Sequence, residues 1–247
     1  MHVPGTDGNE LWPTIAGTKN YWGTSSNVGL AYEIEAGKIL YNYYQPASGG
    51  WQSSENLSDI VGASTGTHHT PSLAWVPGST ASLHVVWHLQ YGSGGSLYDH
   101  SIIHREGTVS SWPNEYFELF GDWMRPSISS VSSGTANLLF QAFSDNKVYK
   151  MHYDGSGWGS ETFISSSASY PSVSARNTDA KYVYTYGNTS PFTVKVSSET
   201  LTKSAGPSYC TRAINWLDGS GAYLKVHVER MYFKTQSGQE IDLGFMR

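Results

Sequence analysis

The sequence predicts an all-β protein, specifically a β-propeller of about five four-stranded antiparallel blades. One motif recurs at intervals of about 40 to 60 residues, which is the length of a propeller blade. Runs rich in β-branched and aromatic residues follow each copy, as in strands. The 247 residues include 26 glycines, and aromatic and charged residues make up 14% each. This composition is typical of short strands separated by tight turns rather than of helices.

The innermost strand of each blade is predicted from a motif of proline, a small residue, an aliphatic residue and another small residue. It reads WPTIAG, TPSLAW, RPSISS and YPSVSA, and a fifth copy, TRAINW, has Arg212 in the proline position. The five copies occupy residues 12–17, 70–75, 125–130, 170–175 and 211–216. Arg125 precedes the motif proline, where the other copies have Trp12, Thr70 and Tyr170, and Arg212 stands at the proline position. Both arginines are expected at the entry point of the innermost strand.

Two further strands are expected after each copy of the motif. The second strands are predicted at 27–34, 82–89, 137–143, 181–186 and 222–228, and the third at 39–44, 97–104, 148–153, 192–196 and 230–234. In the first three copies a glycine-containing turn and a tryptophan follow, at Trp51, Trp112 and Trp158. We expect each tryptophan to start the outer strand and to fill the gap between neighbouring sheets, where its large apolar area is buried.

These elements predict a single propeller domain over residues 1–247. Its blades are expected near 10–59, 68–119, 124–165, 169–204 and 210–247. A Ser-Gly turn and a last strand at the carboxyl end would complete the fifth blade. The fourth and fifth copies lack the tryptophan turn, so a part of a larger ring, excised from a longer protein, stays open as an alternative.

The motifs resemble the sialidase-like, Asp-box (BNR-type) propeller superfamily. The resemblance lies in PSLAW, LHVVW and YDHSIIHREGTVSSW, and in PSISS, LLFQAF and VYKMHYDGSGW, and it extends from Pro13 to about Phe245. The turn motif of that superfamily, Ser-x-Asp-x-Gly-x-x-Trp, is degenerate in this chain. The segment YDGSGW keeps Asp154, Gly157 and Trp158 but has lost the leading serine.

The resemblance implies what an active sialidase would need. It needs three arginines that converge on a carboxylate, a tyrosine nucleophile paired with a glutamate, and an aspartate as acid and base. Arg125 and Arg212 supply two candidate arginines, and no third stands at a corresponding position. Since the expected chemistry is incomplete, the sequence favours a noncatalytic protein, with a glycoside hydrolase of sialidase-like type as the alternative.

The nine histidines are candidate metal ligands. His84 and His88 share one predicted strand, and His100 and His104 share the next. Residues four apart in a strand are separated by about 13 Å, so neither pair can chelate one ion alone. Cross-strand pairing can bring His88 and His100 together. No third ligand is evident, and we expect no metal site and no cofactor.

Four acidic residues could reach the channel face: Glu33, Glu35, Asp122 and Asp145. A general acid and base must face each other across a site, and these four residues are scattered and belong to no recognisable motif. We interpret them as residues of solvated loops.

Loop aromatics give the best indication of a binding site. Flat indole and phenol rings beside polar groups suit the C–H faces of sugars. The candidate ligand-binding residues are Arg125, Trp123, Arg212, Tyr170, His69, Tyr91 and Trp22.

Charge and hydropathy limit the partners of the chain. The net charge is −5 and no basic cluster is present, which excludes nucleic acid as the predicted partner. No apolar stretch reaches the roughly 18 to 20 residues that span a bilayer, so no membrane insertion is expected. A single cysteine rules out an internal disulfide and favours a bacterial source, and the composition is typical of secreted or cell-surface proteins.

The sequence thus predicts a noncatalytic binding or scaffolding propeller of a secreted or cell-surface protein. Its expected partner is a glycan or a cell-surface protein, recognised on the channel face. A structural spacer domain is a further alternative.

Overall fold

The computed structural model describes residues 10–17, 28–35, 37–45, 48–60, 66–76, 83–92, 99–132, 134–176, 179–186, 193–196, 199–202, 212–215, 221–226, 230–234 and 240–245. Every regular element in these ranges is a β-strand, and the strands form five antiparallel sheets. The chain divides into two compact units, Met1–Pro126 and Ser127–Arg247. The prediction of a single domain stays a prediction.

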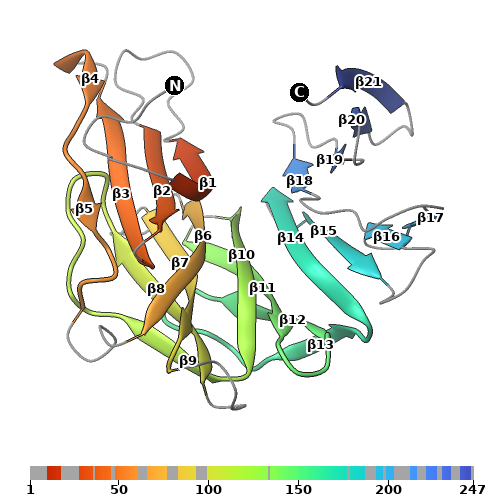
Figure 1. Ribbon diagram of the computed structural model, residues 1–247, viewed down its shortest axis with the longest axis horizontal. Helices are drawn as coiled ribbons and strands as arrows, with labels where there is room; N and C mark the ends of the chain where they lie inside the picture. The colour runs from red at the N-terminus through yellow and green to blue at the C-terminus, as the bar shows by residue number, and fades with distance from the viewer. Residues whose placement is uncertain are drawn as a thin grey trace. The chain divides into compact units, whose positions relative to one another are not determined.

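The first unit contains two complete sheets, whose strands lie side by side in chain order (Figure 1). The first sheet consists of β1 (Glu10–Gly17), β2 (Val28–Ile34), β3 (Lys38–Gln45), β4 (Gly50–Trp51) and β5 (Glu55–Asn56). Both β4 and β5 pair with β3, so the outer strand of this sheet is split in two. The second sheet consists of β6 (Thr67–Trp75), β7 (Leu83–Gln90), β8 (His100–Gly107) and β9 (Phe117–Gly121).

The remaining three sheets have the same order of four strands. The third begins with β10 (Trp123–Ser132), which crosses the boundary between the units, and continues with β11 (Thr135–Ala142), β12 (Val148–Tyr153) and β13 (Thr162–Ser165). The fourth contains β14 (Ala168–Arg176), β15 (Asp179–Tyr186), β16 (Thr193–Val196) and β17 (Glu199–Thr202). The fifth contains β18 (Arg212–Asn215), β19 (Gly221–Val226), β20 (Arg230–Lys234) and β21 (Glu240–Phe245).

Alternation along β7 divides the second sheet into an apolar and a histidine-bearing face. Alternate residues of a strand point to opposite faces of the sheet. The odd-numbered residues of β7 belong to the core of the first unit: Leu83, Val85, Trp87 and Leu89. His84 and His88 are therefore on the other face, which is also buried.

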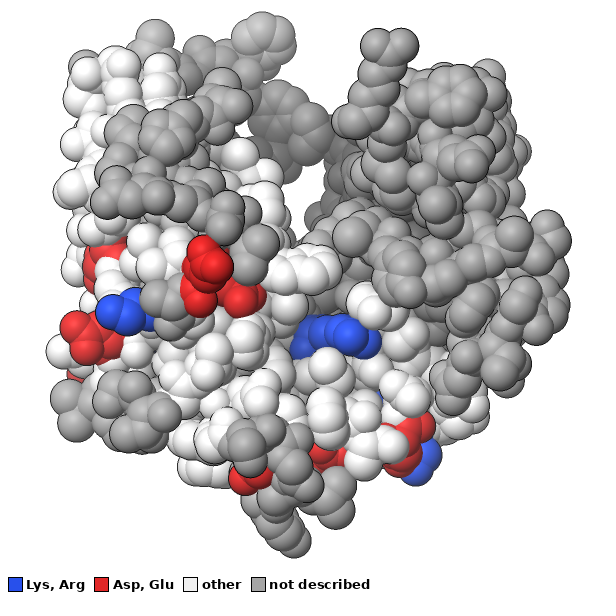
Figure 2. Space-filling model, viewed as in Figure 1, with Lys and Arg blue, Asp and Glu red and all other residues white. Residues whose placement is uncertain are grey.

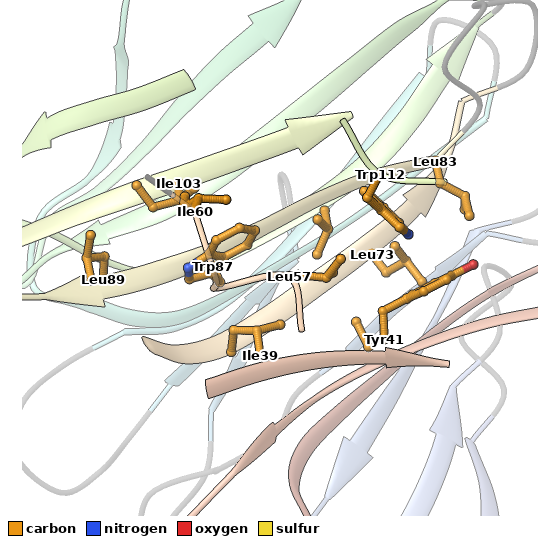
Figure 3. Packing of buried hydrophobic residues seen from close by; sticks show 12 residues of the cluster. Ile39, Tyr41, Leu57, Ile60, Leu73, Leu83, Trp87, Leu89, Ile103 and Trp112 are labelled. Atoms are coloured by element: carbon orange, nitrogen blue, oxygen red, sulfur yellow. The ribbon is translucent and has the colours of Figure 1, made fainter. Parts of the chain in front are cut away.

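The core of the first unit fills the space between its two sheets (Figure 3). Ile39, Tyr41 and Leu57 contribute from the first sheet and its outer connection. Trp112 meets Tyr41 edge to face, with ring centroids 5.1 Å apart. Gly107 makes room for the indole, because a Cβ atom at that residue would lie 2.6 Å from the ring.

The tryptophans depart from the prediction in one respect. Trp112 does fill the gap between the sheets, but it lies in the connection before β9 instead of starting that strand. Trp158 likewise precedes β13 and forms an isolated bridge with Tyr153, whereas Trp51 does lie in a strand. The reason at Trp112 is that its carbonyl oxygen accepts a bond from a side chain, at 3.0 Å from Nη2 of Arg105, so the peptide does not join the sheet there.

Arg105 links the two sheets through backbone carbonyl groups. It is almost fully buried, and its Nη1 atom donates to the oxygen of Leu57 at 2.7 Å. Its Nη2 atom donates to the oxygens of Trp112 at 3.0 Å and Pro113 at 2.5 Å. A planar guanidinium group can satisfy several acceptors at once, so this one side chain holds the segment that follows β5 and the connection that leads to β9.

A hydroxyl group after the motif proline connects successive innermost strands. In the first unit, Oγ1 of Thr14 accepts a hydrogen bond from the backbone N of Leu73 at 3.1 Å. In the second unit, Oγ of Ser127 accepts one from the backbone N of Val173 at the same distance. The recurrence gives a physical reason for the Ser or Thr that follows the proline in the motif.

Candidate ligand-binding site

The residue before the motif proline has a left-handed backbone in four copies. The φ angle is 49° at Trp12 and Thr70, 50° at Arg125 and 54° at Tyr170. A residue before proline normally has an extended backbone, and a non-glycine residue in this region costs of order 1 to 3 kcal/mol. The repeated geometry confirms that these four positions are equivalent. Backbone strain of this kind often marks a functional position.

A polar side chain of the preceding sheet stabilises this backbone in both units. Oε2 of Glu33 accepts a hydrogen bond from the N of Thr70 at 2.9 Å. Oε1 of Gln141 accepts one from the N of Tyr170 at 3.2 Å. A neutral amide is enough at Gln141, whereas Glu33 has a second carboxylate oxygen with a partner of its own.

That partner is His69. Its Nδ1 atom lies 2.8 Å from Oε1 of Glu33. A ring nitrogen that faces a carboxylate carries a proton, so Nδ1 donates to Glu33, and in that tautomer Nε2 can accept a hydrogen bond. The Glu33 side chain is 6% exposed and that of His69 is 30% exposed. The interpretation of Glu33 as a solvated loop residue is wrong, because Glu33 lies in β2 with both carboxylate oxygens bonded to β6.

His88 and His100 continue the cluster. His88 is the cross-strand partner of His69, with ring centroids 5.5 Å apart. Its Nε2 atom lies 2.9 Å from Nδ1 of His100, which confirms the predicted pairing. Burial, and then the nearby charges of His100, His69 and Arg125, lower the pKa of His88 to about 3. His88 is therefore neutral near pH 7.

Arg125 is the cation of this site. Its positive charge is one cause, smaller than burial, His100 and His69, of the lowered pKa of His88. An arginine side chain keeps its charge at all physiological pH values and binds planar anions with two parallel hydrogen bonds. We define the ligand-site cluster as Glu33, His69, His88, His100 and Arg125, all of which belong to the first unit.

Charged side chains are sparse among the described residues on the face of the molecule shown in Figure 2. Over the described part of the face in Figure 2, basic and acidic side chains form small separate groups, with uncharged residues between them. Recognition at such a surface depends on a few directed contacts rather than on a broad electrostatic field.

Trp123 is held by its own turn. Its Nε1 atom donates to the oxygen of Phe120 at 3.2 Å. The indole covers Gly121, where a Cβ atom would lie 2.2 Å from Nε1. The ring is therefore fixed two residues before Arg125, in the orientation that the turn imposes.

Tyr91 is tied to the outer part of the second sheet. Its hydroxyl donates to Oε1 of Glu118 at 2.7 Å, and Oγ of Ser101 donates to the same oxygen at 2.6 Å. Burial, followed by the bond to Glu118, raises the pKa of Tyr91. The phenol hydroxyl of Tyr91 is thus already bonded within the second sheet, to Glu118.

Three other predicted site residues do not belong to the ligand-site cluster. Tyr170 belongs to the second unit, and its backbone N is held by Gln141. Arg212 begins β18, and its side chain lies outside the described residues, as does the whole of Trp22. Of the seven predicted residues, His69 packs against His88, and His69 and Arg125 are both causes of the lowered pKa of His88.

Sequence reasoning missed Glu33 and His88 as site residues, although the sequence carries a signal for both. Each follows a buried aromatic residue in the second strand of its sheet, in the segments YEI and WHL, and Gln141 stands in the same place in FQA. A recurring polar residue in an otherwise apolar strand indicates a repeated hydrogen bond.

Comparison with known proteins shows similarity in fold. No protein-family model matches the chain, and no curated protein matches it. Among solved structures, the Hadza microbial sialidase Hz136 has a TM-score of 0.59 at 9% identity, over 92% of this chain and 56% of that one. Trypanosoma rangeli sialidase in complex with sialic acid has a TM-score of 0.58 at 9% identity, over 96% of this chain and 48% of that one.

A lectin gives a similar result. A mutant of the Aleuria aurantia lectin in complex with Fucα1-6GlcNAc has a TM-score of 0.59 at 9% identity, over 95% of this chain and 79% of that one. The chain spans about half the length of the two sialidases. Together with the four-stranded antiparallel sheets, the similarities to these solved structures show that the fold is a β-propeller.

No helix in the described ranges is long and apolar enough to cross a membrane.

Proposed function

We propose that this chain is a noncatalytic carbohydrate-binding propeller of a secreted or cell-surface protein, and that its ligand-site cluster recognises an acidic glycan. The observation that carries this proposal is the partly exposed His69, whose Nδ1 faces the Glu33 carboxylate, next to His88, whose pKa is lowered in part by the charge of Arg125.

The chemistry of each group suits one part of an acidic sugar. A guanidinium binds a carboxylate with two parallel charge-assisted hydrogen bonds. Nε2 of His69, held as an acceptor by Glu33, can accept a hydrogen bond from a sugar hydroxyl. Because Glu33 also holds the backbone of Thr70, the imidazole is positioned before any ligand binds, which lowers the entropic cost of binding.

The solved structures that share the fold support a saccharide as the ligand class. One of them is a sialidase in complex with sialic acid, and another is a lectin in complex with Fucα1-6GlcNAc. Sialic acid carries the carboxylate that Arg125 would bind, whereas a fucosylated disaccharide is neutral. Arg125 therefore favours the acidic class for this chain.

Acid–base catalysis is the second candidate, and the Glu33–His69 pair is the specific observation that favours it. A histidine whose Nδ1 is oriented by a carboxylate is a common general base. An active sialidase would need a third arginine besides the candidates Arg125 and Arg212, and Trp12, Thr70 and Tyr170 stand at the described positions equivalent to Arg125. The proposal accordingly stays with binding.

A glycan array with the intact chain tests the proposal. We expect acidic glycans to bind the unaltered protein and Lys38→Ala, a control that removes one exposed charge, and Arg125→Ala to lose the signal at least tenfold. Binding to neutral glycans alone, or to none, would contradict it. Release of reducing ends over time from a bound glycan would identify the catalytic alternative instead.

A further inference from the structure

A second group of metal-ligating side chains lies on the histidine-bearing face of the second sheet. It consists of His84 on β7 and of His104 and Glu106 on β8. His84 faces Glu106 directly in the antiparallel register, and His104 is two residues from Glu106 along the same strand. All three side chains therefore point to one face. Four residues along β7 separate His84 from His88, which is about 13 Å in a strand.

The three side chains are close enough to share one ion. One nitrogen of each histidine and one carboxylate oxygen all lie within 4.8 Å of one another. Nδ1 of His84 is 3.0 Å from Nε2 of His104, and Oε1 of Glu106 is 4.0 Å from the other His104 nitrogen, Nδ1. One ion would use only one of these two nitrogens. Ligand atoms of a tetrahedral zinc ion, with bonds of about 2.0 to 2.1 Å, are about 3.3 Å apart.

Burial allows the small adjustment that coordination needs. Both histidines are buried, whereas the Glu106 side chain is 34% exposed. The imidazoles are thus held by the packed sheet, and the carboxylate has room to rotate toward them by up to about 1.5 Å, the difference between the 4.8 Å within which the three ligand atoms lie and the ideal spacing of about 3.3 Å. A fixed pair of ligands with one adjustable ligand is a workable basis for a metal site.

The second histidine pair on this face, His88 and His100, differs from the group of His84, His104 and Glu106 in how many potential ligand atoms lie close together. His88 and His100 make a similar contact, with ring nitrogens 2.9 Å apart. Among the residues that the structure describes, only His84, His104 and Glu106 bring three potential ligand atoms so close together. The carboxylate of Glu106 is therefore the feature that makes the His84–His104 pair a candidate ion site, whereas His88 and His100 form a contact between two imidazoles.

We propose that His84, His104 and Glu106 bind one divalent transition-metal ion of the zinc class, which links β7 to β8. Two nitrogen ligands and one carboxylate form a donor set that zinc accepts. The site is independent of the proposed glycan site, because none of its residues belongs to the ligand-site cluster.

The test uses Co²⁺ as a visible probe for the site in the metal-free chain of 247 residues. We expect one equivalent to bind and to produce d–d absorption bands, and Zn²⁺ to displace it. Glu106→Gln, a conservative change at a partly exposed residue, should weaken Co²⁺ binding at least tenfold and abolish the rise in Tm that Zn²⁺ gives the unaltered chain. Glu115→Gln, at an exposed glutamate before β9, is the matched control and should bind normally.

A second variant distinguishes the two histidine pairs. His100→Gln should keep full Co²⁺ binding if the metal lies at His84 and His104. The proposal is overturned if no saturable signal is found, if Glu106→Gln binds as tightly as the unaltered chain, or if His100→Gln loses as much affinity as Glu106→Gln. The last outcome would place the ion at the other pair.

Discussion

The carboxylate of Glu33 lies 2.8 Å from Nδ1 of His69, at a point where two sheets of the first unit meet. The same carboxylate accepts the backbone N–H of Thr70, whose φ angle is 49°. One side chain on β2 therefore supports a strained backbone and orients an imidazole on β6. These two tasks can be separated by mutation.

Replacing Glu33 tests that separation. Glu33→Gln should fold with nearly unchanged stability, because Gln141 performs the backbone task in the second unit. Its glycan affinity should fall about tenfold, since one charge-assisted hydrogen bond is lost. Glu33→Ala leaves the N–H of Thr70 without this acceptor and should also cost about 1 to 3 kcal/mol of unfolding free energy. Urea denaturation and a glycan titration measure the two effects, and equal stability of both variants would argue against the backbone task.

Acid should destabilise the chain through His88. The pKa of His88 is about 3 in the folded chain, against an ordinary value of 6.5. Between these values the unfolded chain binds a proton that the folded chain does not bind, so stability falls as the pH falls. The slope for one such group is up to about 1.4 kcal/mol per pH unit. His88→Gln should have a shallower dependence between about pH 6 and pH 4, by roughly that amount, and an unchanged slope would show that His88 is not responsible.

Arg105 should be important for stability alone. Arg105→Met fills a similar volume but leaves the carbonyl oxygens of Leu57, Trp112 and Pro113 without their donor. We expect a loss of about 3 kcal/mol in unfolding free energy, since each buried polar group without its partner costs about 1 to 3 kcal/mol and partial rearrangement recovers some of it. Thermal and urea denaturation check this, and a loss below about 1 kcal/mol would mean that water replaces the guanidinium.

The hydrogen bonds that the Thr14 and Ser127 hydroxyl oxygens accept between innermost strands should contribute similar amounts to the free energy of unfolding in the two units. Thr14→Val removes the acceptor for the N–H of Leu73, and Ser127→Ala removes the one for Val173. Each should cost about 1 to 2 kcal/mol and speed amide hydrogen exchange at the residue that has lost its bond. Faster exchange spread evenly over the chain, with no local effect, would contradict this assignment.

Much of the fold could be predicted because the motif repeats. The pattern of proline, small residue and aliphatic residue located the innermost strands, and the repeated φ angles at Trp12, Thr70, Arg125 and Tyr170 confirm that the copies are equivalent. The start of the outer strand could not be predicted from the tryptophans. At Trp112 the bond from Arg105 to its carbonyl keeps that peptide out of the ladder, and such a side-chain bond leaves no local pattern.

The site was harder to predict than the fold. His69 and Arg125 can be identified from loop and entry positions, but the sequence places Glu33 in solvent. Its burial depends on two partners 36 and 37 residues away in the chain, and spacing along one strand cannot show this. For the same reason the sequence does not reveal the meeting of His84 with His104, because these residues approach across two strands.

The most direct test of the central claim compares one acidic oligosaccharide with its methyl ester by isothermal titration calorimetry. If Arg125 binds the carboxylate, the unaltered chain should bind the acid at least tenfold more tightly than the ester, and Arg125→Ala should bind both equally weakly. Equal affinity of the unaltered chain for acid and ester, or a preference for the acid that survives in Arg125→Ala, would contradict the account.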